Sequence, residues 1–253
     1  MSVELSVVLP AYNAAGHIGS SVDQLVAFFA EHGISGEVIV VDDGSSDSTA
    51  QAVPSAGGVH VIRLAQNQGK GAAIRTGMRQ ATGAIRAFTD ADLPYGTQPF
   101  LLARRYIVVR GFHAVAGDRT LPGSSYHHEG WLRRSVSAVA GLTFRTLVTG
   151  GIYDTQCGFK AFRGDVAAEL FRMSRVDGFA VDVELIYLLL KYRLDIKRVP
   201  VRLRYNAGSS VHVIRDSVRA GGDILRMRVN WARGRYRSPA LSAILASESE
   251  APR

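Results

Sequence analysis

Short apolar segments alternate with amphipathic segments along the first ninety residues, and this alternation limits the folds open to the chain more than any other feature. Four apolar segments have the length and composition of buried strands: residues 5–10, 37–41, 59–64 and 84–89. Helical patterns lie between them at residues 17–32 and from Gly69 to about Gln80. Strands that alternate with helices in this way predict an α/β fold with a mostly parallel sheet.

The second half of the chain is less regular. Helical patterns occur at residues 97–109, 130–150, 180–192 and 211–234. A strand is expected at 196–203, and residues 154–162 read as a loop or a short strand. The last segment, 238–253, is small and polar, and we expect it to be a disordered tail behind a single domain over residues 1–237.

Three polar clusters directly follow predicted strands. They are Pro10 to Asn13, Asp42 to Asp47 and Asp90 to Asp92. The carboxyl ends of parallel strands meet at one edge of a sheet, and ligands bind beyond that edge. The three clusters are therefore expected to converge on one binding site.

Asp90-Ala91-Asp92 is the cluster with the clearest chemistry. Two carboxylates at a strand end can share one hard cation with a diphosphate, and Mg²⁺ or Mn²⁺ keeps open positions for phosphate oxygens. Such an ion neutralises the charge that develops on a departing phosphate group. A solvated loop explains most isolated Asp-x-Asp pairs, but the position after an apolar strand favours the metal site.

Asp42 and Asp43 allow both a binding and a structural interpretation. A carboxylate at this strand end can accept hydrogen bonds from a nucleobase or ribose. The segment can also form an Asx turn with Asp47 as a cap. Both interpretations can hold together.

The glycine-rich segment 67–71, followed by Arg75, can approach phosphates through its backbone, while Lys70 and Arg75 add positive charge. It does not have the spacing of a Walker A loop. A glycine turn that leads into an amphipathic helix explains the segment equally well.

Positive charge is concentrated late in the chain. The sequence has 30 Lys and Arg against 22 Asp and Glu, a net charge of +8, and residues 202–237 hold nine arginines and two aspartates. Four arginines share one face of the helix predicted there: Arg215, Arg219, Arg226 and Arg233. This face can bind anionic membrane headgroups beside an apolar stripe, or the arginine stems can simply cover apolar surface.

Secretory and membrane-spanning patterns are not evident in the sequence. The longest apolar candidate, residues 135–153, is interrupted by Arg145 and falls short of an uninterrupted run of about 18 residues. No basic signal-peptide segment follows Met1. The single cysteine, Cys157, excludes an internal disulfide and suits a reducing compartment. We expect a cytoplasmic protein, soluble or peripheral on the cytoplasmic face of a membrane.

Six motifs together resemble a known enzyme family. Three are similar to motifs of the inverting family 2 glycosyltransferases: residues 7–13, 41–47 and 90–92. Three later motifs resemble the branch of dolichyl-phosphate β-glucosyltransferases: residues 154–160, 181–184 and 208–212. The resemblance covers about residues 3–232. It implies a GT-A fold with a nucleotide-binding half over about 1–110 and an acceptor half over about 111–237.

The resemblance also implies an activity, which is transfer of glucose from UDP-glucose to a polyprenyl phosphate with Mg²⁺ or Mn²⁺ as cofactor. The residues expected to line the nucleoside are Pro10, Tyr12, Asn13, and Asp42 or Asp43. The residues expected on the diphosphate side are Lys70, Arg75, Asp90, Ala91 and Asp92, with both aspartates as metal ligands. Arg119 would face the donor or the acceptor phosphate, and Gln156 would lie near the sugar.

The implied reaction is one in-line attack on the anomeric carbon. A lipid phosphate is already anionic at neutral pH, so positioning and charge neutralisation would matter more than a general base. Asp182 would be a base if the acceptor were a hydroxyl, or it would cap the helix at 180–192. GDP-mannose and other sugar donors remain open.

Two alternatives without enzymatic activity also remain. The isoelectric point of about 9.9 suits a nucleic-acid-binding module. Carboxylates at the strand ends argue against it, because they would repel phosphates unless a metal intervened. An inactive nucleotide-sugar sensor is the second alternative, and the intact Asp90 and Asp92 argue against that one.

Overall fold

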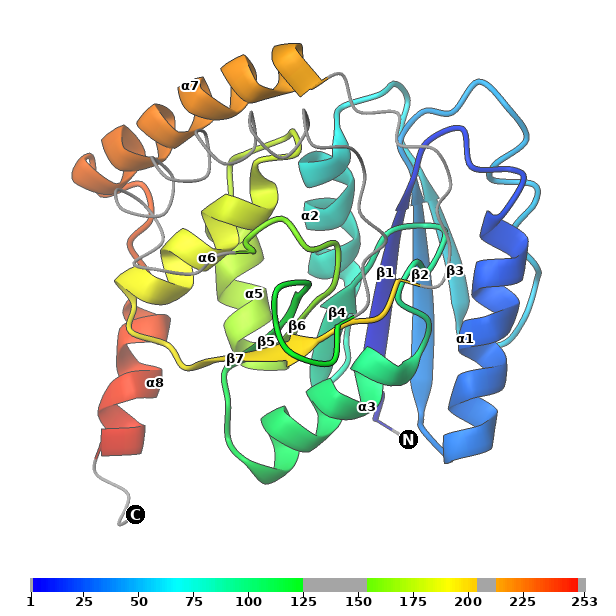
Figure 1. Ribbon diagram of the computed structural model, residues 1–253, viewed down its shortest axis with the longest axis horizontal. Coiled ribbons are helices and arrows are strands. Elements are labelled where there is room, and N and C mark those ends of the chain that lie inside the picture. The colour runs from blue at the N-terminus through cyan, green and yellow to red at the C-terminus, as the bar shows by residue number, and fades with distance from the viewer. Residues whose placement is uncertain (1, 125–153, 204–212, 250–253) are drawn as a thin grey trace.

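The computed structural model describes residues 2–124, 154–203 and 213–249 of the chain (Figure 1). Its centre is a seven-stranded sheet. The strands are β1 (Leu5–Ala11), β2 (Gly36–Asp42), β3 (Val59–Arg63), β4 (Ile85–Phe88), β5 (Ala114–Asp118), β6 (Lys160–Arg163) and β7 (Ile196–Pro200). Their order is β3-β2-β1-β4-β6-β5-β7. Only β6 runs antiparallel to its neighbours, so the predicted mostly parallel sheet is confirmed.

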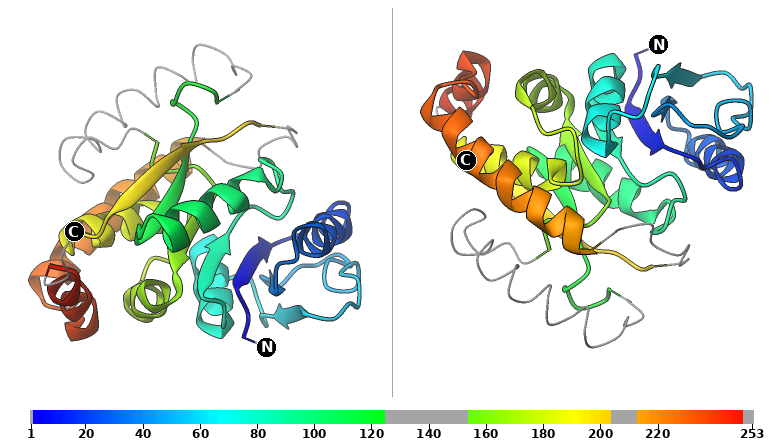
Figure 2. Two further views of the ribbon diagram at one scale, coloured as in Figure 1. Left: turned by 90° about the horizontal axis from the view of Figure 1, so that it is seen from below. Right: turned by 90° about the horizontal axis from the view of Figure 1, so that it is seen from above.

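Helices cover both faces of the sheet, as Figure 2 shows. They are α1 (Ile18–His32), α2 (Lys70–Gln80), α3 (Gln98–Arg104), α5 (Gly164–Met173), α6 (Val181–Lys191), α7 (Val213–Ala232) and α8 (Pro239–Ser249). A short π-helical turn, η1 (Arg105–Val109), continues α3. The helices α1 and α3 pack on one face, and α2, α5 and α6 on the other. No helix in the described part of the chain is long and apolar enough to cross a bilayer.

The central strands are apolar on both sides because both faces of the sheet are covered. In β1, the adjacent residues Val7 and Val8 are both fully buried, which is typical of parallel strands between two helical layers. Close packing of α2 depends on Gly77, where a Cβ would lie 2.5 Å from a methyl group of Val8. The sheet and α2 therefore form one rigid support for the residues at the strand ends.

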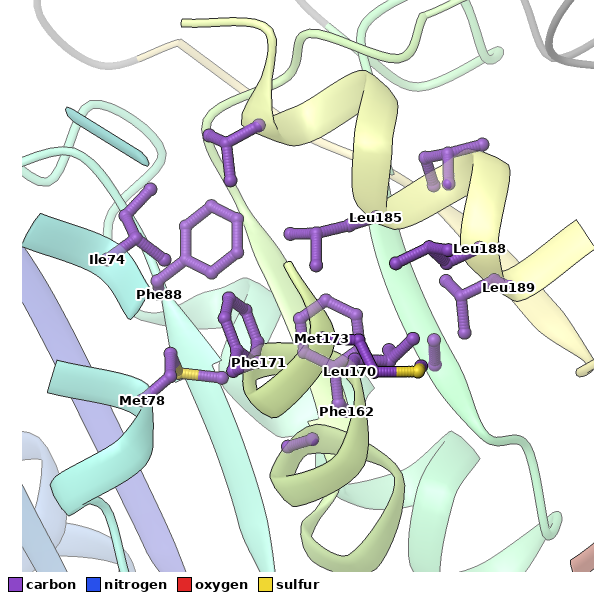
Figure 3. Close-up of a cluster of buried hydrophobic side chains, with 14 of the residues drawn as sticks. Ile74, Met78, Phe88, Phe162, Leu170, Phe171, Met173, Leu185, Leu188 and Leu189 are labelled. Atoms are coloured by element: carbon purple, nitrogen blue, oxygen red, sulfur yellow. The ribbon is translucent and has the colours of Figure 1, made fainter. Parts of the chain in front are cut away.

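The larger hydrophobic core lies between the sheet and the α2–α5–α6 layer (Figure 3). Phe88 of β4, Phe162 of β6 and Phe171 of α5 meet at its centre, with ring centroids 5.6–6.4 Å apart. Such aromatic clusters bury large areas of apolar surface and stabilise the packing of strands against helices. The core fixes the start of α2 and the start of α6 relative to the end of β4.

The end of the chain differs from the prediction of a disordered tail. Residues 239–249 form α8, and Leu241 of this helix is fully buried. Ser238 begins the helix, with its Oγ accepting a hydrogen bond from the Leu241 amide at 3.2 Å and donating to Glu169 at 2.6 Å. Small polar residues suggested disorder, but a serine cap and a few buried apolar side chains are sufficient here for a docked helix.

The second half of the chain contains two further elements that the sequence did not predict, β5 and α5. The strand predicted at 196–203 is shorter, since β7 ends at Pro200. The helix predicted at 130–150 lies outside the described residues. The helix predicted at 211–234 is present as α7, although the side chains of Arg215 and Arg219 lie outside the described part.

Candidate active site

Asp90 lies just beyond the end of β4, in contact with two other segments. Its Oδ1 is 2.5 Å from Nζ of Lys70, the first residue of α2. On its other side is the backbone of Gly158, where a Cβ would overlap Oδ2 of Asp90. The carboxylate is thus held between a lysine and a glycine, with its side chain 37% exposed.

The two carboxylates of the Asp-Ala-Asp segment differ in acidity. Burial by itself would raise the pKa of Asp90, but Lys70 lowers it below its ordinary value. Burial and the neighbouring Asp90 both raise the pKa of Asp92. The pKa of Lys70 is raised against the effect of burial, because Asp90 and Asp182 favour its charged form. The site therefore holds charged groups of both signs close together.

Arg119 follows β5 and is fixed by a bidentate ion pair. Its Nε and Nη2 donate to the two oxygens of Asp154 at 2.8 and 2.7 Å, and its backbone amide donates to the same carboxylate at 2.8 Å. This fork geometry holds the guanidinium plane in one orientation. Its positive charge also favours the ionised form of Asp90, which lowers the pKa of that carboxyl less than Lys70 does. The structure therefore fixes Arg119 at the end of β5 through Asp154.

Asp182 is engaged by a buried lysine. Its Oδ1 is 2.5 Å from Nζ of Lys160, and both side chains are almost completely buried. The same ammonium group donates to the carbonyl oxygens of Thr155 and Cys157, both at 2.9 Å. Asp182 thus joins α6 to β6 and to the loop before it. It also lies in the first turn of α6, where a negative charge suits the helix dipole.

At the other end of the site, Asp42 and Asp43 are buried and hold backbone segments. Oδ1 of Asp42 accepts the Ser45 amide at 2.8 Å, as an Asx-type turn requires. Asp43 accepts the amides of Gln68 and Gly69 at 2.7 and 2.8 Å, so it fixes the glycine-rich segment. The Asx turn at Asp42 is therefore confirmed, while the helix cap expected before Ser48 is wrong, because Asp47 bonds the Thr49 amide in a turn and no helix follows there. The contact of Asp43 with the glycine-rich segment was not predicted, and the binding interpretation of both residues stays open.

One oxygen of Asp42 has an unusual environment. Oδ2 is buried without a hydrogen bond, and its nearest cation is Nε of Arg63 at 3.4 Å. An adjacent pocket of about 310 Å³ is lined by Gly44, Ser45, Arg63, Leu64 and Ala65. Its volume lies at the lower end of the range of ligand pockets, about 300–1,000 Å³.

The first polar cluster faces the second across the strand ends. Asn13 has a positive φ of 51°, and its Oδ1 accepts the Ser46 amide at 3.0 Å. Its backbone amide donates to Oγ of Ser45 at 2.9 Å. Pro10 is partly exposed at the end of β1, and the Tyr12 side chain is 52% exposed. The convergence of the three clusters at one sheet edge follows from the register of β1 with β2 and β4.

Some predicted site residues have other contacts. Arg75 pairs with Asp177 and donates to the carbonyl of Val176 at 3.3 Å. Gln156 is exposed on the loop that Lys160 supports. Ala91 is buried between the two carboxylates. Arg226 in α7 and Arg233, in the turn directly after it, are exposed to solvent.

Three residues that build the site were quoted from the sequence only within longer motifs, and none of them was assigned to the site: Asp154, Lys160 and Glu184. Glu184 is fully buried and accepts hydrogen bonds from the amides of Arg175 and Val176. Burial raises its pKa despite these bonds. Buried lysine and glutamate side chains almost always have a partner. Lys160 lies within Gly-Phe-Lys-Ala-Phe, and Glu184 precedes Leu-Ile-Tyr-Leu, so their apolar neighbours are the signal that each is buried and paired.

The residues at the end of β4 fit a divalent cation. Asp90 and Asp92 offer carboxylate oxygens, which Mg²⁺ and Mn²⁺ prefer, and both residues are partly exposed. Because Gly158 has no Cβ, this residue does not cover Oδ2 of Asp90. Two carboxylate ligands would leave several coordination positions of the ion open to other oxygens.

Comparison of the whole structure with solved structures identifies glycosyltransferases of the GT-A type. Mannosyl-3-phosphoglycerate synthase from Rubrobacter xylanophilus matches with a TM-score of 0.68 and 23% identity, over 94% of this chain and 78% of that one. Glucosyl-3-phosphoglycerate synthase from Mycobacterium tuberculosis, solved with Mn²⁺, UDP and glucosyl-3-phosphoglycerate, matches with a TM-score of 0.64 and 22% identity, over 89% and 80%. The GT-A fold is therefore confirmed.

Comparison of sequences is more specific. The family model "Glycosyl transferase family 2" matches residues 6–171. The dolichyl-phosphate β-glucosyltransferase of Dictyostelium discoideum is 31% identical, over 92% of this chain and 76% of its own length. The enzyme of that name from Drosophila melanogaster is 32% identical, over 93% and 78%. The chain therefore belongs to glycosyl transferase family 2, in the branch of the dolichyl-phosphate β-glucosyltransferases, and it is a glycosyltransferase.

Proposed function

We propose that this enzyme transfers glucose from UDP-glucose to a polyprenyl phosphate of the dolichyl type, with inversion and with Mg²⁺ or Mn²⁺. The observation that supports this most is the Asp90–Asp92 pair at the end of β4, with Lys70 bonded to Asp90 and Arg119 held by Asp154 at the end of β5. Carboxylates and cations at one strand end suit a bound metal ion together with phosphate groups. The named acceptor of the relatives, dolichyl phosphate, carries a phosphate as well.

In this proposal the nucleoside lies between the ends of β1, β2 and β3. The unbonded Oδ2 of Asp42 would accept a hydrogen bond from the base or the ribose, which would satisfy a buried oxygen. Pro10 and the exposed ring of Tyr12 would cover the nucleoside from β1. Asn13 would act indirectly, because its side chain holds the turn at Ser46.

Asp90 and Asp92 would hold the divalent ion against the diphosphate of the donor. A bound ion would neutralise the negative charge that develops on the leaving nucleoside diphosphate. The ammonium group of Lys70 stays charged beside these carboxylates. It would donate a hydrogen bond to a phosphate oxygen of the donor in place of its bond to Asp90. Gln156, exposed on its loop, would approach the sugar.

Arg119 would bind the acceptor phosphate or the far side of the diphosphate, oriented by Asp154. An oxygen of the acceptor phosphate attacks the anomeric carbon, and the bond to the donor β-phosphate oxygen breaks with its electron pair. A phosphate nucleophile is already anionic, so no proton needs to be removed. Asp182 would therefore serve as the partner of Lys160 rather than as a base.

The acceptor is a lipid, so the enzyme would work at a membrane surface. We propose peripheral attachment on the cytoplasmic face, with the exposed arginines of α7 towards anionic headgroups. Arg226 is 81% exposed, and the apolar Leu225 beside it is 66% exposed. An exposed basic and apolar helix surface is typical of interfacial binding.

Transfer is tested with a panel of nucleotide sugars, a short polyprenyl phosphate and Mn²⁺ or Mg²⁺, with products identified by mass spectrometry. We expect glucosyl-phosphoryl-polyprenol from UDP-glucose and no product after chelation. Asp92→Asn should lower the rate at least about a hundredfold without unfolding the protein. The control Asp23→Asn, at an exposed position on α1, should keep full activity. Full activity of Asp92→Asn would refute the metal assignment. A product formed only from GDP-mannose would show that the donor is GDP-mannose and not UDP-glucose.

A further inference from the structure

The segment 174–178, between α5 and α6, covers the start of α2. The carbonyl oxygen of Asp177 accepts the backbone amide of Gly71 at 2.7 Å and that of Ala72 at 3.2 Å. A Cβ at Gly71 would overlap the carbonyl of Val176, so contact between the two backbones is direct. The first amides of a helix have no partners within the helix, and here this segment supplies the acceptor.

Glu184, a residue of α6, holds segment 174–178 through hydrogen bonds. Its carboxylate is fully buried and accepts the amide of Arg175 at 2.9 Å and the amide of Val176 at 3.1 Å. It also accepts the hydroxyl of Tyr236 at 2.5 Å. Three donors are thus needed to satisfy one buried carboxylate, and only one of them comes from a side chain.

Tyr236 reaches Glu184 from the turn between α7 and α8. Its ring is 1% exposed. The turn is fixed separately by Tyr192, whose hydroxyl donates to the carbonyl of Tyr236 at 2.6 Å and accepts the amide of Ser238 at 2.7 Å. Two tyrosine hydroxyls therefore fix this turn: that of Tyr192 bonds to its backbone, and that of Tyr236, a residue of the turn, donates to Glu184. Only the hydroxyl of Tyr236 contacts the carboxylate that holds segment 174–178.

We propose that Glu184 and Tyr236 are positioning residues for Lys70. Lys70 is the first residue of α2, next to Gly71, and its ammonium group reaches Asp90. The segment held by Glu184 fixes the backbone of this first turn through Asp177. A displacement of about 1 Å at a reacting or binding group can cost a hundredfold in rate, so a loose first turn weakens the contacts of Lys70 with the donor diphosphate. This inference rests on the proposed role of Lys70 at the donor.

The contacts also predict that a change at Tyr236 affects binding of the donor but not of the acceptor. Among the described residues, the hydrogen bonds of Glu184 go to Tyr236, Arg175 and Val176, and neither Glu184 nor Tyr236 is hydrogen-bonded to Asp90 or Asp92. A change at Tyr236 should therefore act on donor binding through α2 and leave the acceptor side unchanged. A purely structural role would lower stability and affect all substrates alike.

The test compares Tyr236→Phe with Tyr192→Phe. Each variant keeps its ring and loses one hydroxyl that anchors the turn, to Glu184 in Tyr236→Phe and to the backbone of the turn in Tyr192→Phe. Hydrogen exchange is measured first, without ligand, on peptides that cover residues 70–78. Binding of UDP with Mn²⁺ is then measured by calorimetry, and KM is measured for donor and acceptor separately.

We expect exchange at residues 71–72 to become at least about fivefold faster in Tyr236→Phe and to stay at the wild-type rate in Tyr192→Phe. The Kd for UDP and the KM for the donor should rise about five- to twentyfold in Tyr236→Phe alone, with an unchanged KM for the acceptor. Equal effects in the two variants, or wild-type exchange and binding in Tyr236→Phe, would overturn the inference. If wild-type protein bound no nucleotide diphosphate with Mn²⁺, the proposed function would fail and the inference with it.

Discussion

At the scale of single residues, the site depends on an absent side chain as well as on charged ones. Gly158 allows the backbone to approach Oδ2 of Asp90, and a Cβ there would overlap that oxygen. We predict that Gly158→Ala displaces the Asp90 carboxylate and lowers the rate of transfer at least about tenfold, with the fold retained. Gly57→Ala is the matched control, because a Cβ at Gly57 meets no atom within 4 Å. Equal rates for the two variants would contradict this role of Gly158.

A second residue-scale prediction concerns acid stability. Burial would raise the pKa of Glu37, but hydrogen bonds from Ser6 and Thr82 lower it below the ordinary value of 4.5. Ionised Glu37 thus stabilises the fold above about pH 4.5, and this contribution is lost as the pH falls through the lowered pKa. Glu37→Gln should cost about 1–3 kcal/mol at pH 7, and the difference from wild type should shrink towards pH 3.

Urea unfolding at a series of pH values measures this difference. Glu31→Gln, at an exposed position on α1, is the control and should match the wild type at every pH. A cost for Glu37→Gln that stays constant from pH 7 to pH 3 would show that the ionised form of Glu37 has no special stabilising role.

The sequence predicted the residues at strand ends better than their partners. Asp42, Asp90 and Asp92 could be located because an apolar strand precedes each of them directly, and the direction of a parallel strand sets where its end lies. The partners Asp154 and Lys160 could not be assigned, since their contacts join segments far apart in the chain. Arg75 shows the same limit, because its charge suggested a phosphate while its contacts in the structure are with Asp177 and Val176.

At the scale of elements, one buried ion pair joins β6 to α6. Lys160 and Asp182 are 4% exposed or less, and each would leave a buried charge if its partner were removed. We predict that Lys160→Met lowers the free energy of unfolding by about 3–5 kcal/mol. Adding Asp182→Leu should restore part of that loss, because no buried charge then remains.

A double-mutant cycle with urea unfolding of the two single variants and the double variant checks this prediction. The coupling should be favourable and larger than about 1 kcal/mol. Strictly additive losses would show that Lys160 acts mainly through the carbonyls of Thr155 and Cys157 rather than through Asp182.

The regularity of the elements decided which of them could be predicted. The elements from β1 to β4 were located within a few residues, because strands and helices of ordinary length alternate there. The strand β5 was missed because its sequence, Ala-Val-Ala-Gly-Asp, has only small side chains and a glycine. Gly117 in this strand is needed for tertiary packing, since a Cβ there would lie 2.6 Å from Sγ of Cys157. Such a requirement is not visible in local sequence.

At the scale of the whole molecule, the C-terminal helices are part of the body rather than an appendage. The turn before α8 inserts Tyr236 into the core, and Leu241 packs in the same cluster. Composition alone favoured a disordered tail because it does not record what the apolar residues of a short segment pack against. The helix α7 leads into this turn and lies along the end of the molecule towards which β1 points (Figure 1).

This placement leads to a prediction about membrane binding. Arg226 is exposed on α7 next to the exposed Leu225, and Arg233 is exposed in the turn directly after the helix. We predict that the double variant Arg226→Glu/Arg233→Glu binds vesicles with anionic lipid at least about tenfold more weakly, since each basic residue near such a surface contributes about 1 kcal/mol. Co-sedimentation with vesicles of phosphatidylcholine and phosphatidylglycerol measures this binding.

The control for this prediction changes the net charge by the same amount elsewhere. Arg79 and Arg110 are exposed on other elements, and Arg79→Glu/Arg110→Glu should bind vesicles nearly as well as the wild type. If both double variants lost binding equally, attraction would come from the overall charge of +8 rather than from α7. If neither lost binding, Arg226 and Arg233 would serve to cover apolar surface, and α7 would not be a membrane-binding face.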